Sequence, residues 1–274
     1  MKPSPSIRWL FLPLLALAAS GRLSLAAALP CEDMTAYQPA VVTSPADGGH
    51  LSVAVVIHIM EQPDQPCEVR KAWTADQVAR VFGPDTRDSR SGNSVWASTR
   101  VRFVLRDVAL HSFAPAAGMV ATGQRIKVPQ GGPRGDAAFE AAFADLVARF
   151  HRDRAVNVYL WRRIDGRPVG FGRSTRTGLG KATVWLDTEC GQDSLLVCAR
   201  YVAHELGHAL GLYHAGPGTC GAVDAEFQST CATLAAPCPG IPKSQRLMTI
   251  GASGRKLCPA EVAAAEKMAG NEFK

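Results

Sequence analysis

Residues 196–212 read LVCARYVAHELGHALGL, and this pattern predicts a helix with two chemically different faces. At about 100° per residue, His204 and His208 lie one turn apart and only about 40° apart around the helix axis. The opposite side is apolar and carries Val202, Ala203, Leu206, Ala209 and Leu210. One helix therefore buries an apolar face and points two imidazoles towards a common point, as two ligands of one metal ion require.

Three nearby residues extend this pair into a candidate zinc site. Glu205 is rotated by about 100° from His204, so its carboxylate can hold a water molecule rather than bind the metal. Gly211 has no Cβ and can end the helix in a left-handed turn, so that the chain returns and presents His214 as a third ligand. Three protein ligands leave one coordination position open, as in catalytic zinc sites. The alternative, a buried helix with surface histidines, requires the whole string HELGHALGLYH to be an accident.

The string from His204 to His214 resembles the HExxHxxGxxH signature of the metzincin zinc metallopeptidases. Metzincins also have a tight turn whose methionine lies beneath the zinc, and Met248 in RLMT matches it. Within metzincins the chain is similar to the pappalysin-like (cytophagalysin) group, through the strand VVIHIM, the strand NVYLW and the cysteine-rich stretch that ends LMTIG…LC. The similarity covers most of residues 50–265.

Two positions depart from the pattern of that group. The segment Cys220–Cys238 lacks the Asp-Thr-Pro expected there, and Ile250 stands where some metzincins have a tyrosine. These departures concern the subgroup and leave the zinc string intact. The resemblance also raises the question of a structural calcium ion (Ca2+), which no residue pattern in this sequence supports.

The resemblance implies a zinc-dependent endopeptidase with one catalytic Zn2+ ion and Glu205 as general base. A polypeptide substrate would bind extended along a sheet edge, and residues 170–175 are the candidate edge strand. The loop after Met248 would wall the substrate pocket, where Arg255 or Lys256 could favour acidic side chains or be solvated surface charges. Two other functions stay open, hydrolysis of a non-peptide amide and zinc binding without catalysis. The presence of the general base argues against the second.

The rest of the chain predicts an α/β fold of the zincin type (α+β) with a mixed, mostly parallel sheet. Two long helices are expected besides the zinc-site helix, one capped by Thr74 and reaching Phe82, and one from Asp136 to Phe150. An aromatic stripe in the second helix reads as core. Strands are expected at 51–60, 100–110, 155–161 and 181–187, with a glycine-broken edge strand within 166–175.

Residues 1–28 are interpreted as a cleavable signal peptide, because a basic start precedes a short apolar core and small residues. A membrane anchor is the alternative, but the 11 apolar residues 9–19 are too few to span about 30 Å of hydrocarbon. The protein is therefore expected to be secreted or periplasmic. An irregular lead-in would occupy 29–50. The metzincin-like catalytic domain would occupy 51–274, with an irregular, disulfide-rich C-terminal lobe over 214–274.

All eight cysteines follow the predicted signal peptide, and an even number in an exported chain indicates up to four disulfides. A structural zinc ion on thiolates is the competing interpretation, but the sequence contains no CxxC pair. Cys31 or Cys67 could also block the catalytic zinc as a latency thiolate. Only some twenty residues precede the first strand, too few for a folded pro-domain, so a disulfide role is preferred for both.

The net charge of the chain argues against one class of function. Loss of the signal peptide, which carries three basic residues and no acid, lowers the formal charge from +6 to +3. The remaining basic residues are scattered, which argues against nucleic-acid binding, and a monomer is expected.

His58 in the first strand is interpreted as a core residue, whereas His50, His111 and His151 are expected at the surface.

Overall fold

The fold is described from a computed structural model in which the chain beyond residue 30 forms one compact unit. The predicted signal peptide and most of the predicted lead-in lie outside the described residues. Those are 31–37, 49–119, 126, 137–162, 170–173, 181–188, 190, 195–216, 228–249 and 254–273. No helix among them is long and apolar enough to cross a membrane.

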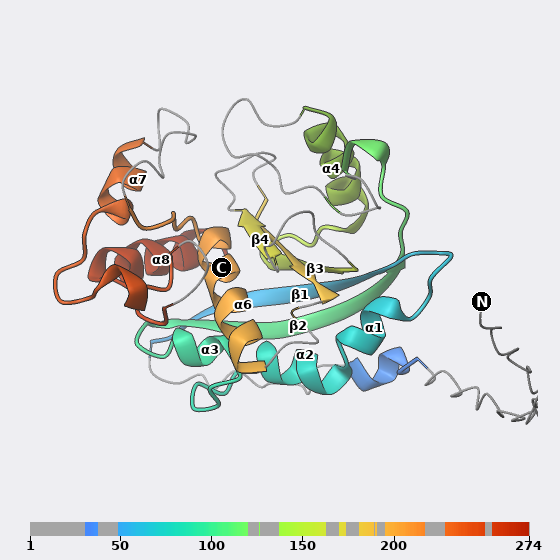
Figure 1. Cartoon of the computed structure of the whole chain (residues 1–274), viewed down its shortest axis with the longest axis horizontal. Coiled ribbons are helices and arrows are strands. Elements are labelled where there is room, and N and C mark those ends of the chain that lie inside the picture. Colours follow the sequence, from blue (N-terminus) through green and yellow to red (C-terminus); the bar gives the residue numbers. More distant parts are fainter. Residues whose placement is uncertain are drawn as a thin grey trace, which may run out of the picture. The chain divides into compact units, whose positions relative to one another are not determined.

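The centre of the fold is a sheet of five strands in the order β2-β1-β3-β5-β4 (Figure 1). The first four of these are parallel neighbours, and β4 runs antiparallel to β5 at the edge. The predicted mixed, mostly parallel sheet and its edge strand are therefore confirmed. The strands are β1 (Leu51–Glu61), β2 (Val101–Ser112), β3 (Val156–Trp161), β4 (Gly170–Arg173) and β5 (Thr183–Asp187).

Helices lie where the sequence predicts them after Thr74, after Asp136 and around His204. The short helices at 68–72 and 92–95 and the two helices after His214 were not predicted. Thr74 caps α2 through a reciprocal bond with Gln77, as the sequence predicts, but that helix has only 7 residues. The C-terminal lobe is less irregular than expected, because α8 has 14 residues. The helices are α1 (Glu68–Ala72), α2 (Ala75–Val81), α3 (Gly92–Val95), α4 (Ala137–Phe150), α6 (Leu195–Ala209), α7 (Gln228–Ala235) and α8 (Pro259–Glu272), with 3-10 turns η1 (Met34–Tyr37), η2 (Ala117–Met119) and η5 (Lys243–Gln245).

Each face of the sheet is covered by its own hydrophobic core, since successive strand side chains point to opposite faces. On one face, Ile57 and Ile59 of β1 pack with residues of α1, α2, α3 and α6. On the other face, Met60 packs with Phe143 and Leu146 of α4, so the aromatic stripe predicted as core is confirmed. Figure 1 shows α4 on one side of the sheet and α1 to α3 on the other.

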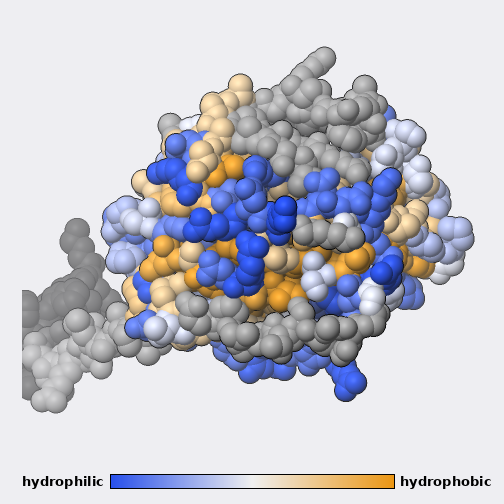
Figure 2. Space-filling view, turned by 180° about the vertical axis from the view of Figure 1, so that it is seen from behind, coloured by the Kyte–Doolittle hydropathy of each residue, from blue (hydrophilic) through white to orange (hydrophobic). Residues whose placement is uncertain are grey.

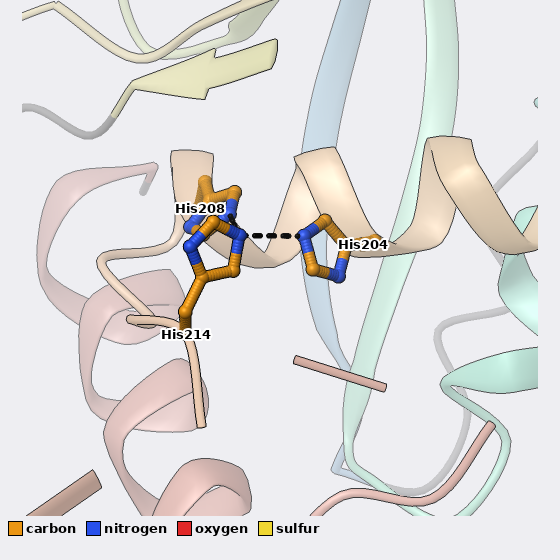
Figure 3. A group of neighbouring side chains, drawn as sticks. All are labelled: His204, His208 and His214. Carbon is orange, nitrogen blue, oxygen red and sulfur yellow. Dashed lines mark hydrogen bonds between the residues drawn. The ribbon is translucent and has the colours of Figure 1, made fainter. Parts of the chain in front are cut away.

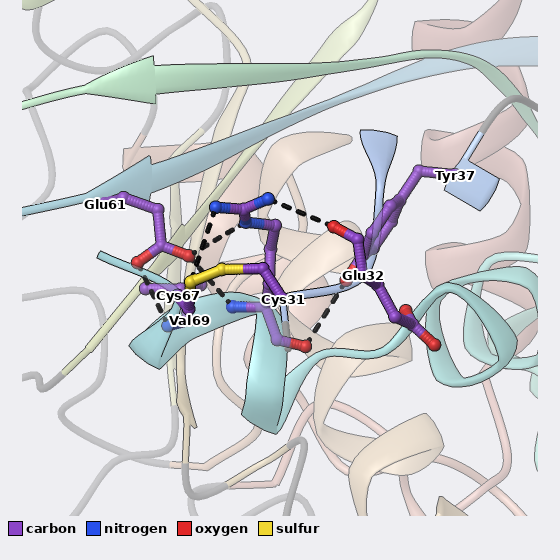
Figure 4. Close-up of a disulfide and its surroundings, with 7 residues drawn as sticks. Cys31, Glu32, Tyr37, Glu61, Cys67 and Val69 are labelled. Carbon is purple, nitrogen blue, oxygen red and sulfur yellow. Dashed lines mark hydrogen bonds and ion pairs between the residues drawn. A yellow bond between two sulfur atoms is a disulfide. The ribbon is translucent and has the colours of Figure 1, made fainter. Parts of the chain in front are cut away.

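Disulfides tie down the chain at three places in the described residues. The pairs are Cys31–Cys67, Cys190–Cys198 and Cys238–Cys258. Cys231 is also disulfide-bonded, and the described residues include no free cysteine. Figure 4 shows the first pair at the start of α1, so both of its sulfurs are unavailable as metal-blocking thiolates. Disulfides of this number indicate an oxidising compartment.

Two histidines expected at the surface are instead part of a buried polar chain. His58 is fully buried, with its Nδ1 3.0 Å from Nε2 of His111 and its Nε2 2.9 Å from Oδ1 of Asn157. The amide nitrogen of Asn157 in turn lies 3.4 Å from Nε2 of His151. The surface prediction for His111 and His151 was wrong because their neighbours come from distant strands, whereas His50 is exposed as expected.

Hydrophilic residues form a band across the face of the molecule shown in Figure 2, with hydrophobic residues beside it. Among the described residues, the exposed large hydrophobic side chains are Leu110 and Leu196. Single exposed leucines are normal on a protein surface and require no partner. The expected monomer stays a prediction.

Candidate metal centre

The end of α6 brings the third predicted ligand back to the other two. The helix ends at Ala209, earlier than the predicted Leu212, and Gly211 adopts a left-handed conformation with φ of 78°. The amide of Leu212 donates to the carbonyl of Gly207 at 2.9 Å, and the amide of Gly211 donates to that of His208 at 2.8 Å. These two bonds form a Schellman motif, which reverses the chain after the helix. The predicted role of Gly211 is thereby confirmed.

The three histidines of the candidate site converge through the same ring nitrogen (Figure 3). Nε2 of His214 lies 3.2 Å from Nε2 of His204 and 3.1 Å from Nε2 of His208. Tetrahedral zinc with Zn–N bonds of 2.0–2.1 Å places its nitrogens about 3.3 Å apart. Both separations from His214 agree with a shared tetrahedral ion, and the ligand atoms of all three histidines lie within 4.8 Å of one another.

Backbone carbonyls fix which nitrogen of each helical histidine faces that point. Nδ1 of His204 lies 2.7 Å from the carbonyl oxygen of Leu247, and Nδ1 of His208 lies 2.8 Å from that of Leu212. Because a carbonyl only accepts, both Nδ1 atoms carry the proton and both Nε2 atoms present a lone pair. Two lone pairs thus face His214, whose single ring proton can satisfy only one of them. A cation among the three nitrogens removes this conflict, which is a second reason why the residues fit a metal.

Burial keeps the three imidazoles in the neutral form that binds metal. It lowers the pKa of His204 to about 4, although the hydrogen bond to Leu247 acts in the opposite direction. Burial also lowers the pKa of His208 well below its ordinary value, helped by the other two rings, and lowers the pKa of His214. At neutral pH the site is therefore deprotonated and its nitrogens are free to coordinate.

Met248, the methionine of the predicted turn, packs against α6, the helix that carries His204 and His208. Its side chain is fully buried, and a Cβ added to Gly207 would lie 2.6 Å from its sulfur. The carbonyl of Met248 accepts a hydrogen bond of 2.7 Å from the amide of Ala215, next to His214. Met248 therefore braces the helix from below and the returning chain from the side.

Glu205, the predicted general base, is buried on α6 with only 6% of its surface exposed. Carboxylates are rarely buried without a defined task, and this one directly follows His204 in the helix. The contacts that sequence reasoning missed are the carbonyls of Leu212 and Leu247 and the small residue Gly207. Every residue has a backbone carbonyl, so no residue type in the sequence predicts these contacts. Only the folded structure shows them.

The predicted substrate strand lies next to the metal-binding helix. α6 contacts β4, which hydrogen-bonds to β5 on one side and has no partner strand on its other side within the described residues. Residues 174–175 of the predicted strand lie outside the described residues.

Arg255, which was expected to be either a pocket residue or a solvated charge, is held by a hydrogen bond to the neighbouring Ser94. Its guanidinium donates to the hydroxyl of Ser94 at 2.7 Å and is half-buried. Burial lowers its pKa, assisted by the nearby Arg200. Lys256 is exposed, as expected of a surface charge.

Comparisons with known proteins add little to this geometry. No family model matches the chain, and no curated protein matches it. A solved structure described as "Structure of a chaperone-substrate complex" is similar over 82% of this chain, at 14% identity and a TM-score of 0.41. The chain spans 36% of the length of that protein. A likeness this distant carries no argument about function.

Proposed function

We propose that the protein is an exported, zinc-dependent endopeptidase of the metzincin type. The observation that carries the proposal is the convergence of the three histidines, with Nε2 of His214 at 3.2 Å from that of His204 and 3.1 Å from that of His208. Backbone carbonyls orient the rings of His204 and His208. A site with three histidines leaves a position for water and substrate, whereas a purely structural zinc site is closed by four protein ligands. The oxidising compartment indicated by the disulfides agrees with export.

His204, His208 and His214 would hold the ion. Zinc, when bound there, supplies a Lewis acid that activates water near neutral pH and polarises a carbonyl. Glu205 takes the proton of the attacking water on a carboxylate oxygen and delivers it to the nitrogen of the leaving amine. Its buried position favours this role, because a carboxylate that is shielded from bulk water exchanges its proton with the substrate rather than with solvent.

The substrate is proposed to be an extended polypeptide added to the free edge of β4. An edge strand offers unpaired backbone groups, and a peptide that pairs with them lies beside α6 and its histidines. Backbone pairing reads no side chain, so selectivity must come from pockets next to the metal.

The decisive experiment compares the wild type with Glu205→Gln, using zinc content and cleavage of an unfolded protein as separate readouts. We expect both proteins to hold one zinc ion and only the wild type to cleave. Glu272→Gln, a matched change at an exposed carboxylate, should leave both readouts unchanged. A zinc-loaded wild type that cleaves no peptide library would instead favour a non-peptide amide hydrolase or a binding module.

A further inference from the structure

An apolar cavity of about 700 Å³ opens directly after the metal-binding stretch. It lies between α7 and the segment that leads to Met248. Its apolar walls come from small and rigid residues, namely Ala232, Ala235, Pro237, Ile241 and Pro242. A volume of this size is typical of sites that enclose a small ligand or a few side chains.

A backbone segment of three residues, 214–216, connects the candidate metal centre to the cavity. Gly216, which lines the cavity, is only two residues beyond His214, so their Cα atoms are within about 7.6 Å of each other. The amide of Gly216 donates to the carbonyl of Ala235 at 3.1 Å, which fixes α7 to this strand. The amide of the intervening Ala215 donates to Met248. The cavity wall therefore begins two residues after the third histidine of the candidate site.

The positively charged Lys243 lies at the rim of this apolar cavity. A Cβ added to Gly216 would lie 2.8 Å from Nζ of Lys243, so the ammonium lies close to the backbone of Gly216. Gly216 also has a positive φ of 128°, a conformation that favours glycine. Lys243 is exposed and forms no ion pair with the residues that the structure describes, whereas Arg246 is neutralised by Glu261 at 2.7 Å.

We propose that this cavity is a specificity site for the polypeptide substrate, which binds a large apolar side chain followed closely by an acidic side chain. The inference rests on the proposed peptidase function and names its substrate class. The apolar side chain enters the cavity and is stabilised there by removal of its surface from water. The carboxylate pairs with Lys243, whose charge lacks a partner in the described part of the chain. Because an endopeptidase substrate continues past the site, the carboxylate belongs to Asp or Glu rather than to the chain end.

The test measures binding separately from catalysis, with zinc-loaded Glu205→Gln and fluorescently labelled peptides. The peptides contain Phe-Glu, Phe-Gln or Ala-Glu at an internal position, or end in Phe with a free carboxylate. We expect the Phe-Glu peptide to bind most tightly, about 2- to 5-fold better than Phe-Gln. Adding Lys243→Gln should remove this difference, and Ala232→Phe should fill the cavity and weaken both Phe-containing peptides.

Matched controls separate these effects from general damage to the protein. Lys267→Gln removes an exposed lysine of α8, away from the cavity. Thr233→Phe adds the same ring to α7 at a position that does not line the cavity. Both should bind the peptides like the parent. Equal binding of Phe-Glu and Phe-Gln, or tight binding of only the peptide that ends in Phe, would overturn the inference. Selective binding without cleavage by the wild type would instead refute the peptidase while leaving the specificity site intact.

Discussion

The sulfur of Met248 lies directly against Gly207 of α6, on the helix that carries His204 and His208. A Cβ at Gly207 would meet Sδ at 2.6 Å and Cε at 3.3 Å, closer than side chains normally approach. Glycine is unfavourable within a helix by about 0.5–1 kcal/mol relative to alanine. Its presence here is explained by the room it leaves for the methionine.

Gly207→Ala should therefore weaken the metal site although alanine favours helix. We expect a destabilisation of about 1–3 kcal/mol from overpacking and a zinc affinity at least about 10-fold lower, measured by urea unfolding and by competition with a chromophoric chelator. Gly270→Ala is the control, since nothing lies within 4 Å of a Cβ there. It should leave zinc affinity unchanged and the free energy of unfolding equal or slightly higher. Wild-type zinc affinity in Gly207→Ala would contradict the bracing role of Met248.

Acid should destabilise the protein through the buried histidine chain. Burial lowers the pKa of His58 to about 4, partly offset by its bond to Asn157, while His111, His151 and Arg152 lower it further. The unfolded chain binds a proton near pH 6.5 and the folded chain only near pH 4, so this stability is present above pH 6.5 and is lost as the pH falls towards 4. Between pH 7.5 and pH 5 the loss from His58 should be roughly 2 kcal/mol.

Urea unfolding of the zinc-loaded protein at several pH values measures this effect. His58→Phe removes the titrating group, so the difference in unfolding free energy between pH 7.5 and pH 5 should shrink by the same amount, even if the variant is less stable throughout. An unchanged pH dependence in His58→Phe would show that another group carries it.

The ion pair between Arg246 and Glu261 should contribute far more to the stability of the fold than exposed ion pairs do. The two side chains are 3% and 0% exposed, and Arg246 also donates to the carbonyls of Leu234 and Ala236. Arg246→Met leaves the buried carboxylate unpaired, and we expect a loss of roughly 3–5 kcal/mol in urea unfolding. Arg80→Met, which breaks an exposed pair with Asp76, should lose less than about 1 kcal/mol.

A second variant keeps this prediction testable if Arg246→Met folds poorly. Glu261→Gln removes the charge but retains an oxygen for the amide of Cys258, which the carboxylate now caps. The double variant should therefore be more stable than Arg246→Met alone. A double variant that is less stable would show that the charge of Glu261 is not what destabilises the single one.

The Cys31–Cys67 disulfide should stabilise the whole compact unit rather than the metal site. It closes a loop over a sequence separation of 36, which corresponds to roughly 3–4 kcal/mol of lost unfolded-state entropy. The double variant Cys31→Ser/Cys67→Ser should unfold at correspondingly lower urea and still bind one zinc ion. Loss of zinc from a folded double variant would contradict this separation of roles.

Local patterns predicted the elements whose determinants are local. The run of apolar, β-branched residues predicted β1, and the capping pattern of Thr74 predicted α2, because each depends on neighbours in sequence. The same holds for the turn at Gly211, where one glycine after the histidine pair was sufficient. The histidine ligands could likewise be read from spacing alone.

Features that depend on contacts between distant residues were not predicted from the sequence. His111 and His151 were expected at the surface because they lie near element ends, yet contacts of His111 with His58 and of His151 with Asn157 leave both half-buried. α8 was not predicted because its apolar face is carried mostly by alanine, which gives weak periodicity. The rim lysine, Lys243, carried no signal because its neighbour Gly216 is distant in sequence.

The bond between His204 and the carbonyl of Leu247 connects two regions that are 43 positions apart. His208 takes its orienting carbonyl from Leu212 within the same turn, so that ring is set locally, whereas His204 is set only once the C-terminal lobe has docked. We therefore expect metal uptake and lobe docking to be thermodynamically coupled, so that each strengthens the other by the same factor. Chelation should loosen the C-terminal lobe before it unfolds the sheet.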